Sequence, residues 1–131
     1  MNSAAKDFVT LLANASSLGL VFKTNLFVGK EPTTPNDTVT LFDGVSSAPQ
    51  LTLTKGEDYF YDAVQIRIRN MDYNTGYALA KGIMGVLHGL GQQTVNNTLY
   101  SVIYCSNGPA PLGWDDNGRI IFVLNFEVQR R

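Results

Sequence analysis

The chain has 131 residues and a net charge of −1, from 10 Lys and Arg against 11 Asp and Glu, with one His and one Cys. Hydrophobic residues at 44% and charged residues at 16% predict one folded domain over residues 1–131 and exclude a disordered chain. A single Cys cannot form an internal disulfide, and one His with one Cys cannot build a His/Cys zinc site, which disfavours metal and redox functions.

The chain begins with a predicted helix. Asn2 or Ser3 is the expected cap, Asp7 lies in the first turn, and Gly19 marks the end. Apolar residues recur on one face at three- and four-residue spacing: Ala5, Phe8, Leu11, Leu12 and Ala15.

Strands and a long loop are predicted next. Residues 25–28 and 38–42 have the composition of strands, and two prolines in the loop at 29–37 forbid regular structure there. We interpret this loop as a long hairpin tip. Asp43-Gly44 is a turn signal, and Leu51 and Leu53 mark a further short strand.

Residues 59–70 form the clearest predicted strand. One face is apolar except for Asp62, which we expect at the rim of the sheet: Phe60, Val64, Ile66 and Ile68. The other face is polar: Tyr59, Tyr61, Gln65, Arg67 and Arg69. This alternation is typical of a strand with one face on the core.

A second helix is predicted from a cap at Asn74 or Thr75 to about Leu90. Its inward residues are Tyr77, Ala80, Ile83, Met84 and Leu87. Three glycines recur along this helix: Gly82, Gly85 and Gly89. We interpret them as positions where the helix packs closely on the sheet, in preference to a contact with another subunit.

The last third predicts two strands. Residues 99–105 are apolar on both faces, which indicates a central, covered strand. A Pro/Gly loop at 106–114 and a turn at 115–118 precede a long terminal strand at 119–129. The expected fold class is α+β: an antiparallel or mixed β-sheet or sandwich with two main helices packed on one face and a partly polar opposite face.

Few residues in the sequence indicate a catalytic, metal or nucleic-acid-binding site. His88 lies on an apolar helix, Cys105 ends a buried strand, and Asp115 and Asp116 fit a turn and not a calcium loop. The four Arg residues that could contact DNA are Arg67, Arg69, Arg130 and Arg131, but a net charge of −1 lacks the basic surface that such binding needs. We therefore expect no catalytic residue, cofactor or metal site.

The start of the chain predicts no export or membrane insertion. Lys6 and Asp7 stand where a signal peptide needs its apolar core, and no apolar run reaches about eighteen residues. We expect a protein made and kept in a cytoplasm-like compartment, with no membrane partner.

One stretch carries a resemblance. Residues 109–126 combine a Pro-rich loop, Leu-Gly, an Asp, Gly118-Arg119 and an aromatic strand that carries Asn125: PAPLGWDDNGRIIFVLNF. Four earlier blocks agree in order: an apolar strand before Gly29, the Asp43-Gly44 turn, the strand QIRIR at 65–69, and a helix starting near Tyr77. From about Leu20 to Arg131 the chain resembles the tail-terminator type of minor capsid protein of tailed phages.

The resemblance implies a structural virion protein and no enzyme. The family's subunits form a hexameric ring that caps the tail tube, stops its polymerisation and joins it to the head. Implied partners are further copies of the chain, the tail tube protein and a head-completion or connector protein, with DNA only passing through the ring. The implied location is the virion tail or neck, and the host cytoplasm during assembly.

The expected interface residues lie on two predicted loops, 30–37 and 106–114, and beside them: Lys30, Glu31, Asp37, Arg67, Arg69, Trp114, Asp115, Asp116 and Arg119. We expect both loops to project and touch neighbours, with an ordinary hairpin tip as the alternative for the first. Arg67 and Arg69 fit a solvated sheet face or pair with acids of a neighbouring subunit. Trp114 covers the core or anchors an interface, the former preferred, and Arg119 pairs with Asp115 or Asp116.

Other functions stay open at this point. A head-completion or neck adaptor ring protein would have the same size and sequence pattern. A small ligand- or nucleic-acid-binding domain, or a small enzyme using Asp115, Asp116 or His88, is the weaker alternative.

Overall fold

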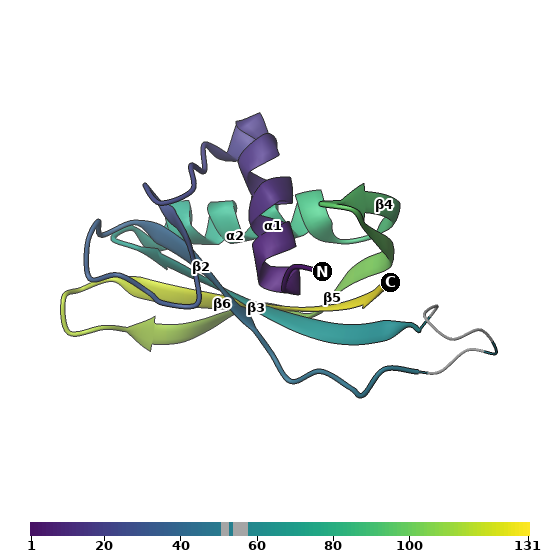
Figure 1. Cartoon of the computed structure of the whole chain (residues 1–131). Helices are drawn as coiled ribbons and strands as arrows, with labels where there is room; N and C mark the ends of the chain where they lie inside the picture. Colours follow the sequence, from purple (N-terminus) through teal and green to yellow (C-terminus); the bar gives the residue numbers. More distant parts are fainter. Residues whose placement is uncertain (51–52, 54–57) are drawn as a thin grey trace.

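A computed structural model describes residues 1–50, 53 and 58–131 and arranges them as two helices on one face of a curved sheet (Figure 1). The elements in chain order are α1 (Ala4–Asn14), the short 3-10 helix η1 (Ser16–Leu18), β1 (Leu26–Val28), β2 (Thr38–Asp43), β3 (Phe60–Asn70), α2 (Tyr73–Leu87), β4 (Leu90–Val95), β5 (Thr98–Trp114) and β6 (Ile120–Arg130). The strand order is β1-β2-β3-β6-β5-β4. The predicted α+β class, with both helices on one face of a mixed sheet, is confirmed.

Strands β3 and β6 form the centre of the sheet and confirm the predicted alternation. They pair antiparallel over their full length, from Phe60 opposite Arg130 to Asn70 opposite Ile120. The apolar faces of both strands lie under the helices, where Ile66, Phe122 and Leu124 are completely buried. The short strand predicted at Leu51 and Leu53 lies in a segment largely outside the described residues.

Helix α1 begins where the sequence predicted. Ser3 is its cap, and the Ser3 hydroxyl accepts a hydrogen bond from the Lys6 N–H at 3.3 Å. Phe8 is fully buried and meets Phe126 edge to face at 5.8 Å between ring centres. The contact places α1 directly against the sheet.

Helix α2 is capped by Asp72, and the predicted cap at Asn74 or Thr75 is wrong. The Asp72 carboxylate accepts hydrogen bonds from the Thr75 N–H at 2.8 Å and the Thr75 hydroxyl at 2.7 Å, and these bonds lower the pKa of Asp72. The helix ends at Leu87, before the predicted Leu90, because Gly89 turns the chain at φ +86° into strand β4.

The glycines of α2 have different surroundings. A Cβ on Gly76 would lie 3.1 Å from Phe122, and one on Gly82 would lie 3.0 Å from Leu18 of η1. Gly85 borders open space. Close packing on the sheet therefore occurs at Gly76, which was not among the predicted glycines, whereas Gly82 packs closely on η1. The interpretation of Gly85 and Gly89 as close packing on the sheet is wrong, because both border open space.

The largest corrections concern β4 and β5. The predicted loop at 106–114 is the second half of strand β5, which pairs with β6 through several bulges as far as Trp114. Two prolines are tolerated there because β4 pairs only with residues 98–103 and leaves this half of β5 at the sheet edge. The prediction of a covered strand is also wrong, because Tyr104 is 40% exposed on the face without helices.

The first two strands are parallel, which rules out the predicted hairpin. Leu26 lies opposite Val39 and Val28 opposite Leu41 in the same direction. Residues 29–37 must therefore run back from the end of β1 to the start of β2, and this return determines where the loop lies.

A buried polar cluster fastens the first helix to the last strand. Asp7 is fully buried and accepts hydrogen bonds from the Tyr100 hydroxyl at 2.5 Å and from Asn96 at 2.8 Å. The Arg130 guanidinium lies 3.6 Å from Asp7 and 2.6 Å from Asp62. Asp62, predicted at the rim, thus supplies a second carboxylate to balance a nearly buried arginine.

Tyr100 makes the fold less stable at alkaline pH. Burial, and then the hydrogen bond to Asp7, raise the pKa of the Tyr100 phenol well above its ordinary value. The folded chain holds this proton more tightly, so stability is complete below the unfolded pKa of about 10 and falls as the pH rises further. We predict that Tyr100→Phe flattens this decline in urea unfolding, while Tyr73→Phe leaves it unchanged. An equal decline in all three proteins would contradict the assignment.

Two glycine substitutions should have opposite effects on the free energy of unfolding. Gly108 has φ +110°, and a Cβ there would lie 2.5 Å from the Val123 carbonyl oxygen, so Gly108→Ala should destabilise the fold by more than about 1 kcal/mol. Gly85→Ala should stabilise it by about 0.5–1 kcal/mol, because the helix has open space there. Urea denaturation measures both, and equal effects would refute the packing described for β5.

Candidate interface surfaces

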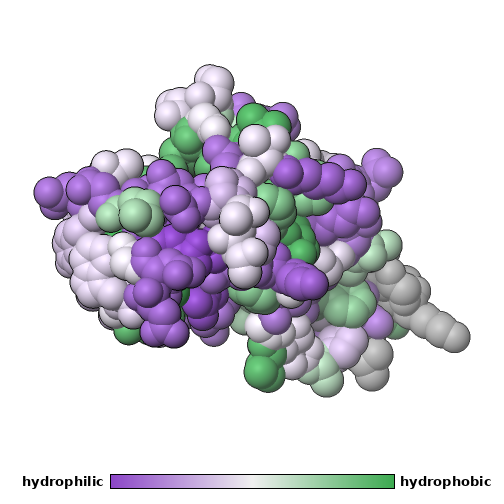
Figure 2. Space-filling model, turned by 90° about the vertical axis from the view of Figure 1, so that its left-hand side faces the viewer, coloured by the Kyte–Doolittle hydropathy of each residue, from purple (hydrophilic) through white to green (hydrophobic). Residues whose placement is uncertain are grey.

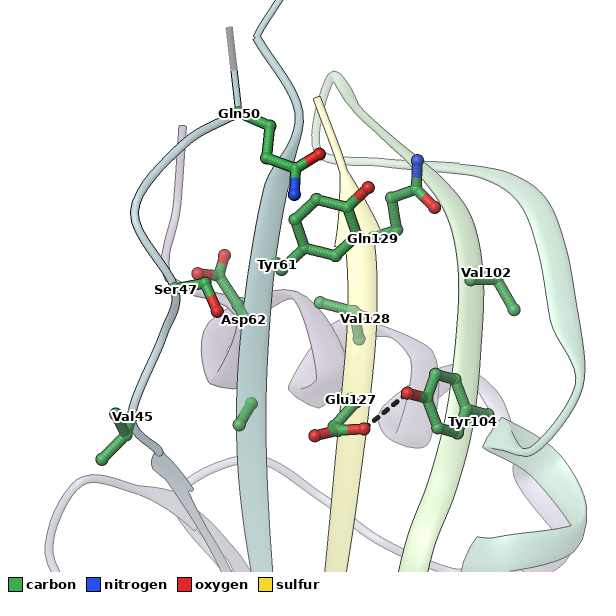
Figure 3. Close-up of a pocket in the computed structure, with 11 residues that line it drawn as sticks. Val45, Ser47, Gln50, Tyr61, Asp62, Val102, Tyr104, Glu127, Val128 and Gln129 are labelled. Carbon is green, nitrogen blue, oxygen red and sulfur yellow. Dashed lines mark hydrogen bonds between the residues drawn. The ribbon is translucent and has the colours of Figure 1, made fainter.

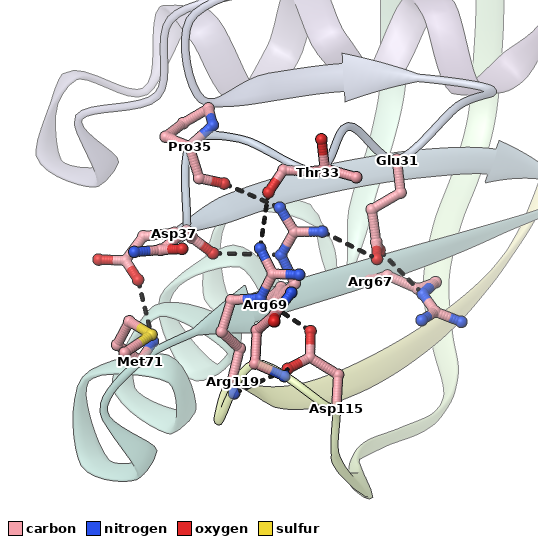
Figure 4. A network of polar contacts seen from close by, with 11 residues as sticks. Glu31, Thr33, Pro35, Asp37, Arg67, Arg69, Met71, Asp115 and Arg119 are labelled. Carbon is pink, nitrogen blue, oxygen red and sulfur yellow. Dashed lines mark hydrogen bonds and ion pairs between the residues drawn. The ribbon is translucent and has the colours of Figure 1, made fainter.

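Six of the nine predicted interface residues meet in one network at the end of the sheet where β3 finishes and β6 begins (Figure 4). They come from three segments: the loop at 29–37, strand β3, and the turn between β5 and β6. The six are Glu31, Asp37, Arg67, Arg69, Asp115 and Arg119. Lys30, Trp114 and Asp116 lie on the same segments and are exposed.

Glu31 joins the loop to strand β3. Its two carboxylate oxygens bind Arg67 Nε at 3.0 Å and Arg69 Nη1 at 3.2 Å. Arg69 also donates to the carbonyls of Pro35 at 2.8 Å and Asn36 at 3.1 Å, and only 3% of its side chain is exposed. The loop therefore lies on the sheet face opposite the helices, and the prediction that it projects is wrong.

Arg119 extends the network to the β5–β6 turn. Its Nε binds Asp115 Oδ2 at 2.8 Å, as predicted, and its Nη1 donates to the Thr33 carbonyl at 2.7 Å. The hydrogen bond from the Arg119 backbone N–H lowers the pKa of the Asp115 carboxyl. Asp37 accepts a hydrogen bond from the Met71 N–H at 2.9 Å. These contacts fix the loop at 29–37 to the ends of β3 and β6.

Arg67 and Arg69 were expected on a solvated face or paired with a neighbouring subunit. Within the chain both already pair with Glu31, which explains how two positive charges are accommodated under the loop. A role for these residues in contact with another subunit stays a prediction.

Trp114 does not cover the core, contrary to the preferred interpretation. Its side chain is 57% exposed, and the adjacent Leu112 is 61% exposed. Trp114 lies at the end of the half of β5 that pairs with β6 but not with β4. Asp116 follows at the turn and is exposed as well.

A groove at the β1 edge escaped the sequence analysis. Its volume is about 330 Å³, and Phe22, Phe27, Val28 and Pro32 line it together with Lys23 and Lys30. The signal in the sequence is the pair of short apolar runs on either side of Asn25, of which only residues 25–28 were predicted, as a strand. The Lys23 ammonium lies 5.7 Å from the centre of the Phe22 ring. This edge is therefore both apolar and positively charged.

The sheet face without helices carries a larger groove of about 500 Å³ (Figure 3). Residues 44–50 form one wall by running along β3, with hydrogen bonds from Gly44 to Ala63 at 2.7 Å and from Ser47 to Tyr61 at 3.0 Å. Amide, hydroxyl and small apolar side chains line most of it, including Gln50, Tyr61, Val102, Tyr104, Glu127 and Gln129.

Among the described residues, two carboxylates line this groove, Asp62 and Glu127, and Asp62 is paired with Arg130 at 2.6 Å. The Tyr104 hydroxyl donates a hydrogen bond to Glu127, and this bond raises the pKa of Tyr104. Both carboxylates are therefore already bound within the chain, Asp62 to Arg130 and Glu127 to Tyr104.

Two of the groups considered for catalysis, His88 and Cys105, are joined to one another within the fold. His88 Nδ1 accepts a hydrogen bond from the Cys105 N–H at 2.9 Å, which joins the end of α2 to β5. Burial raises the pKa of the Cys105 thiol, opposite to the shift that activates a nucleophile. In residues 1–50, 53 and 58–131, no three His, Cys, Asp or Glu side chains gather in a way that could hold a metal ion. No helix in these ranges is long and apolar enough to cross a membrane.

Comparison with known proteins adds a family and a fold. A family model described as bacteriophage tail terminator protein matches residues 12–131. A solved chain from the virion of a native gene transfer agent particle superposes with a TM-score of 0.70 at 14% sequence identity, over 98% of this chain and 94% of that one. No curated protein matches the chain in sequence.

Removal of Glu31 should release the loop at 29–37. Glu31→Ala leaves Arg69 buried without its carboxylate, and we expect a loss of about 3–5 kcal/mol in unfolding free energy. Hydrogen exchange should also become faster at the Met71 N–H, which the loop protects. The matched control is Lys30→Ala at the neighbouring exposed position, which should change stability by less than about 0.5 kcal/mol. Equal effects of the two variants would contradict the network.

Proposed function

The chain belongs to the bacteriophage tail terminator protein family, and we propose that it forms a hexameric ring that caps the tail tube, stops its polymerisation and joins it to the head. The observation that carries this proposal is the family match over residues 12–131, which includes the sheet, α2 and the whole polar network. The whole chain would then act as a single tail-terminator domain.

The arrangement of the strands provides the two kinds of surface that a ring of identical subunits needs. A closed ring of identical subunits needs two different, complementary surfaces on each copy, and their geometry must close after a fixed number of steps. The two opposite edges of the sheet provide surfaces of this kind. The similarity to a chain of a gene transfer agent virion supports the fold, and with the family it favours a structural role.

The proposed partners follow from this position between tail and head. One side of the ring would contact the tail tube protein, and the other would contact a head-completion or connector protein. DNA would pass through the opening without being recognised. The chain would assemble in the host cytoplasm and remain in the virion, and no catalytic step is involved.

Deletion of the gene from the phage that carries it tests the proposal. Electron microscopy should show tails that are overlong or not joined to heads, because nothing stops tube growth. The purified chain should shift from smaller species to a hexamer when tail tubes are added, measured by sedimentation velocity and native mass spectrometry. Tails of normal length with empty, leaking heads would contradict the proposal and indicate a head-completion protein.

A further inference from the structure

The end of the sheet that holds the polar network has two edges that point in opposite directions. One row of paired residues crosses it from edge to edge: Leu26, Val39, Ile68, Phe122 and Pro111. Within the described residues, the second half of β5 pairs with β6 alone. Strand β1 pairs with β2, and on its outer side Leu26 is bridged by residues 21–23 of the same chain. Figure 2 views this end, where apolar patches lie among mostly hydrophilic surface.

The β1 edge carries the apolar groove and two lysines. Phe27 and Pro32 are partly exposed in the groove, and Lys23 and Lys30 are exposed at it. Within the described residues, neither lysine forms an ion pair. The groove therefore suits an occupant that combines a large apolar side chain with negative charge.

The β5 edge has this combination. Leu112 and Trp114 expose 61% and 57% of their surface, and Asp116 follows two residues after Trp114. In the described part of the chain, Asp116 has no ion-pair partner, whereas the charge of Asp115 is already balanced by Arg119. Trp is the residue most enriched at the centres of protein interfaces.

We propose that the β5 edge of one copy docks on the β1 edge of the next copy. Leu112 and Trp114 fill the groove formed by Phe22, Phe27, Val28 and Pro32, and Asp116 lies near Lys23 and Lys30. The contact joins different surfaces, so it repeats from copy to copy and can close a ring. This inference rests on the proposed ring function, and it specifies which surfaces meet.

Both surfaces are held in place before they meet. Arg119 fixes the turn that carries Asp116 and reaches Thr33, and Glu31 fixes the loop that carries Lys30 and Pro32. Little conformational freedom of the loop and the turn remains to be lost on docking, which favours association.

The only Trp of the chain reports directly on this contact. The fluorescence of Trp114 should shift to shorter wavelength when the wild-type chain assembles, with or without tail tubes. Trp114→Glu, and separately Lys23→Glu with Lys30→Glu, should weaken self-association at least about tenfold. Because all three residues are exposed, these variants should keep the thermal stability of the wild type.

Matched controls separate the contact from general effects. Lys6→Glu with Lys81→Glu reverses the charge of two exposed lysines on the helices, and Val45→Glu adds an acid at an exposed apolar position; both should assemble like the wild type.

Asp116→Lys combined with Lys23→Glu and Lys30→Glu should restore association, because the charges are exchanged across the contact. A mixture of the Trp114→Glu and the double lysine variants should give dimers without closed rings.

The possible results separate the proposed contact between the β5 and β1 edges from the proposed formation of a ring. If the wild type forms rings, and the Trp114 and lysine variants form them equally well, the proposed edges are wrong and the ring stands. A fluorescence shift with tubes but without self-association would place Trp114 against the tube protein and overturn the inference. A wild-type chain that stays single with tubes present overturns both proposals.

Discussion

Arg69 is the residue on which the arrangement of this end of the molecule depends. Its guanidinium is almost completely buried on the sheet face opposite the helices, where an unbalanced charge would be strongly unfavourable. Glu31 supplies the opposite charge, and the carbonyls of Pro35 and Asn36 accept two further hydrogen bonds. The loop therefore lies against this face on its way from the end of β1 back to the start of the parallel strand β2.

The position of this loop determines two other features. Thr33 is placed to accept a hydrogen bond from Arg119, so the β5–β6 turn is fixed to the loop, although the two are 86 positions apart in the sequence. Lys30 and Pro32 then flank the groove at the β1 edge. The ion pairs of Glu31 and the hydrogen bond from Arg119 to Thr33 thus connect the two edges through which, in our proposal, neighbouring copies meet.

The sequence predicted those elements whose pattern is local. The alternation in β3 and β6, the Ser3 cap and the Asp115–Arg119 pair all depend on residues close together in the chain, and all are confirmed. Strand β4 was missed because it is exposed and polar, and the second half of β5 because Pro and Gly usually mark loops. The position of the loop at 29–37 depends on contacts between segments more than thirty positions apart, for which a single sequence carries no local signal. The residues of the β1 groove are close together in the chain, but their apolar runs alone do not show that they stay exposed. The family resemblance came from the order of several short blocks and agrees with the family match.

A cryo-electron microscopy reconstruction of the head-proximal end of the phage tail tests the account most directly. The account predicts a closed hexameric ring of this chain on the last tube layer, with Trp114 of each copy in the groove beside Lys23 and Lys30 of the next. A tube end without this chain, or with single copies that do not touch one another, would contradict it.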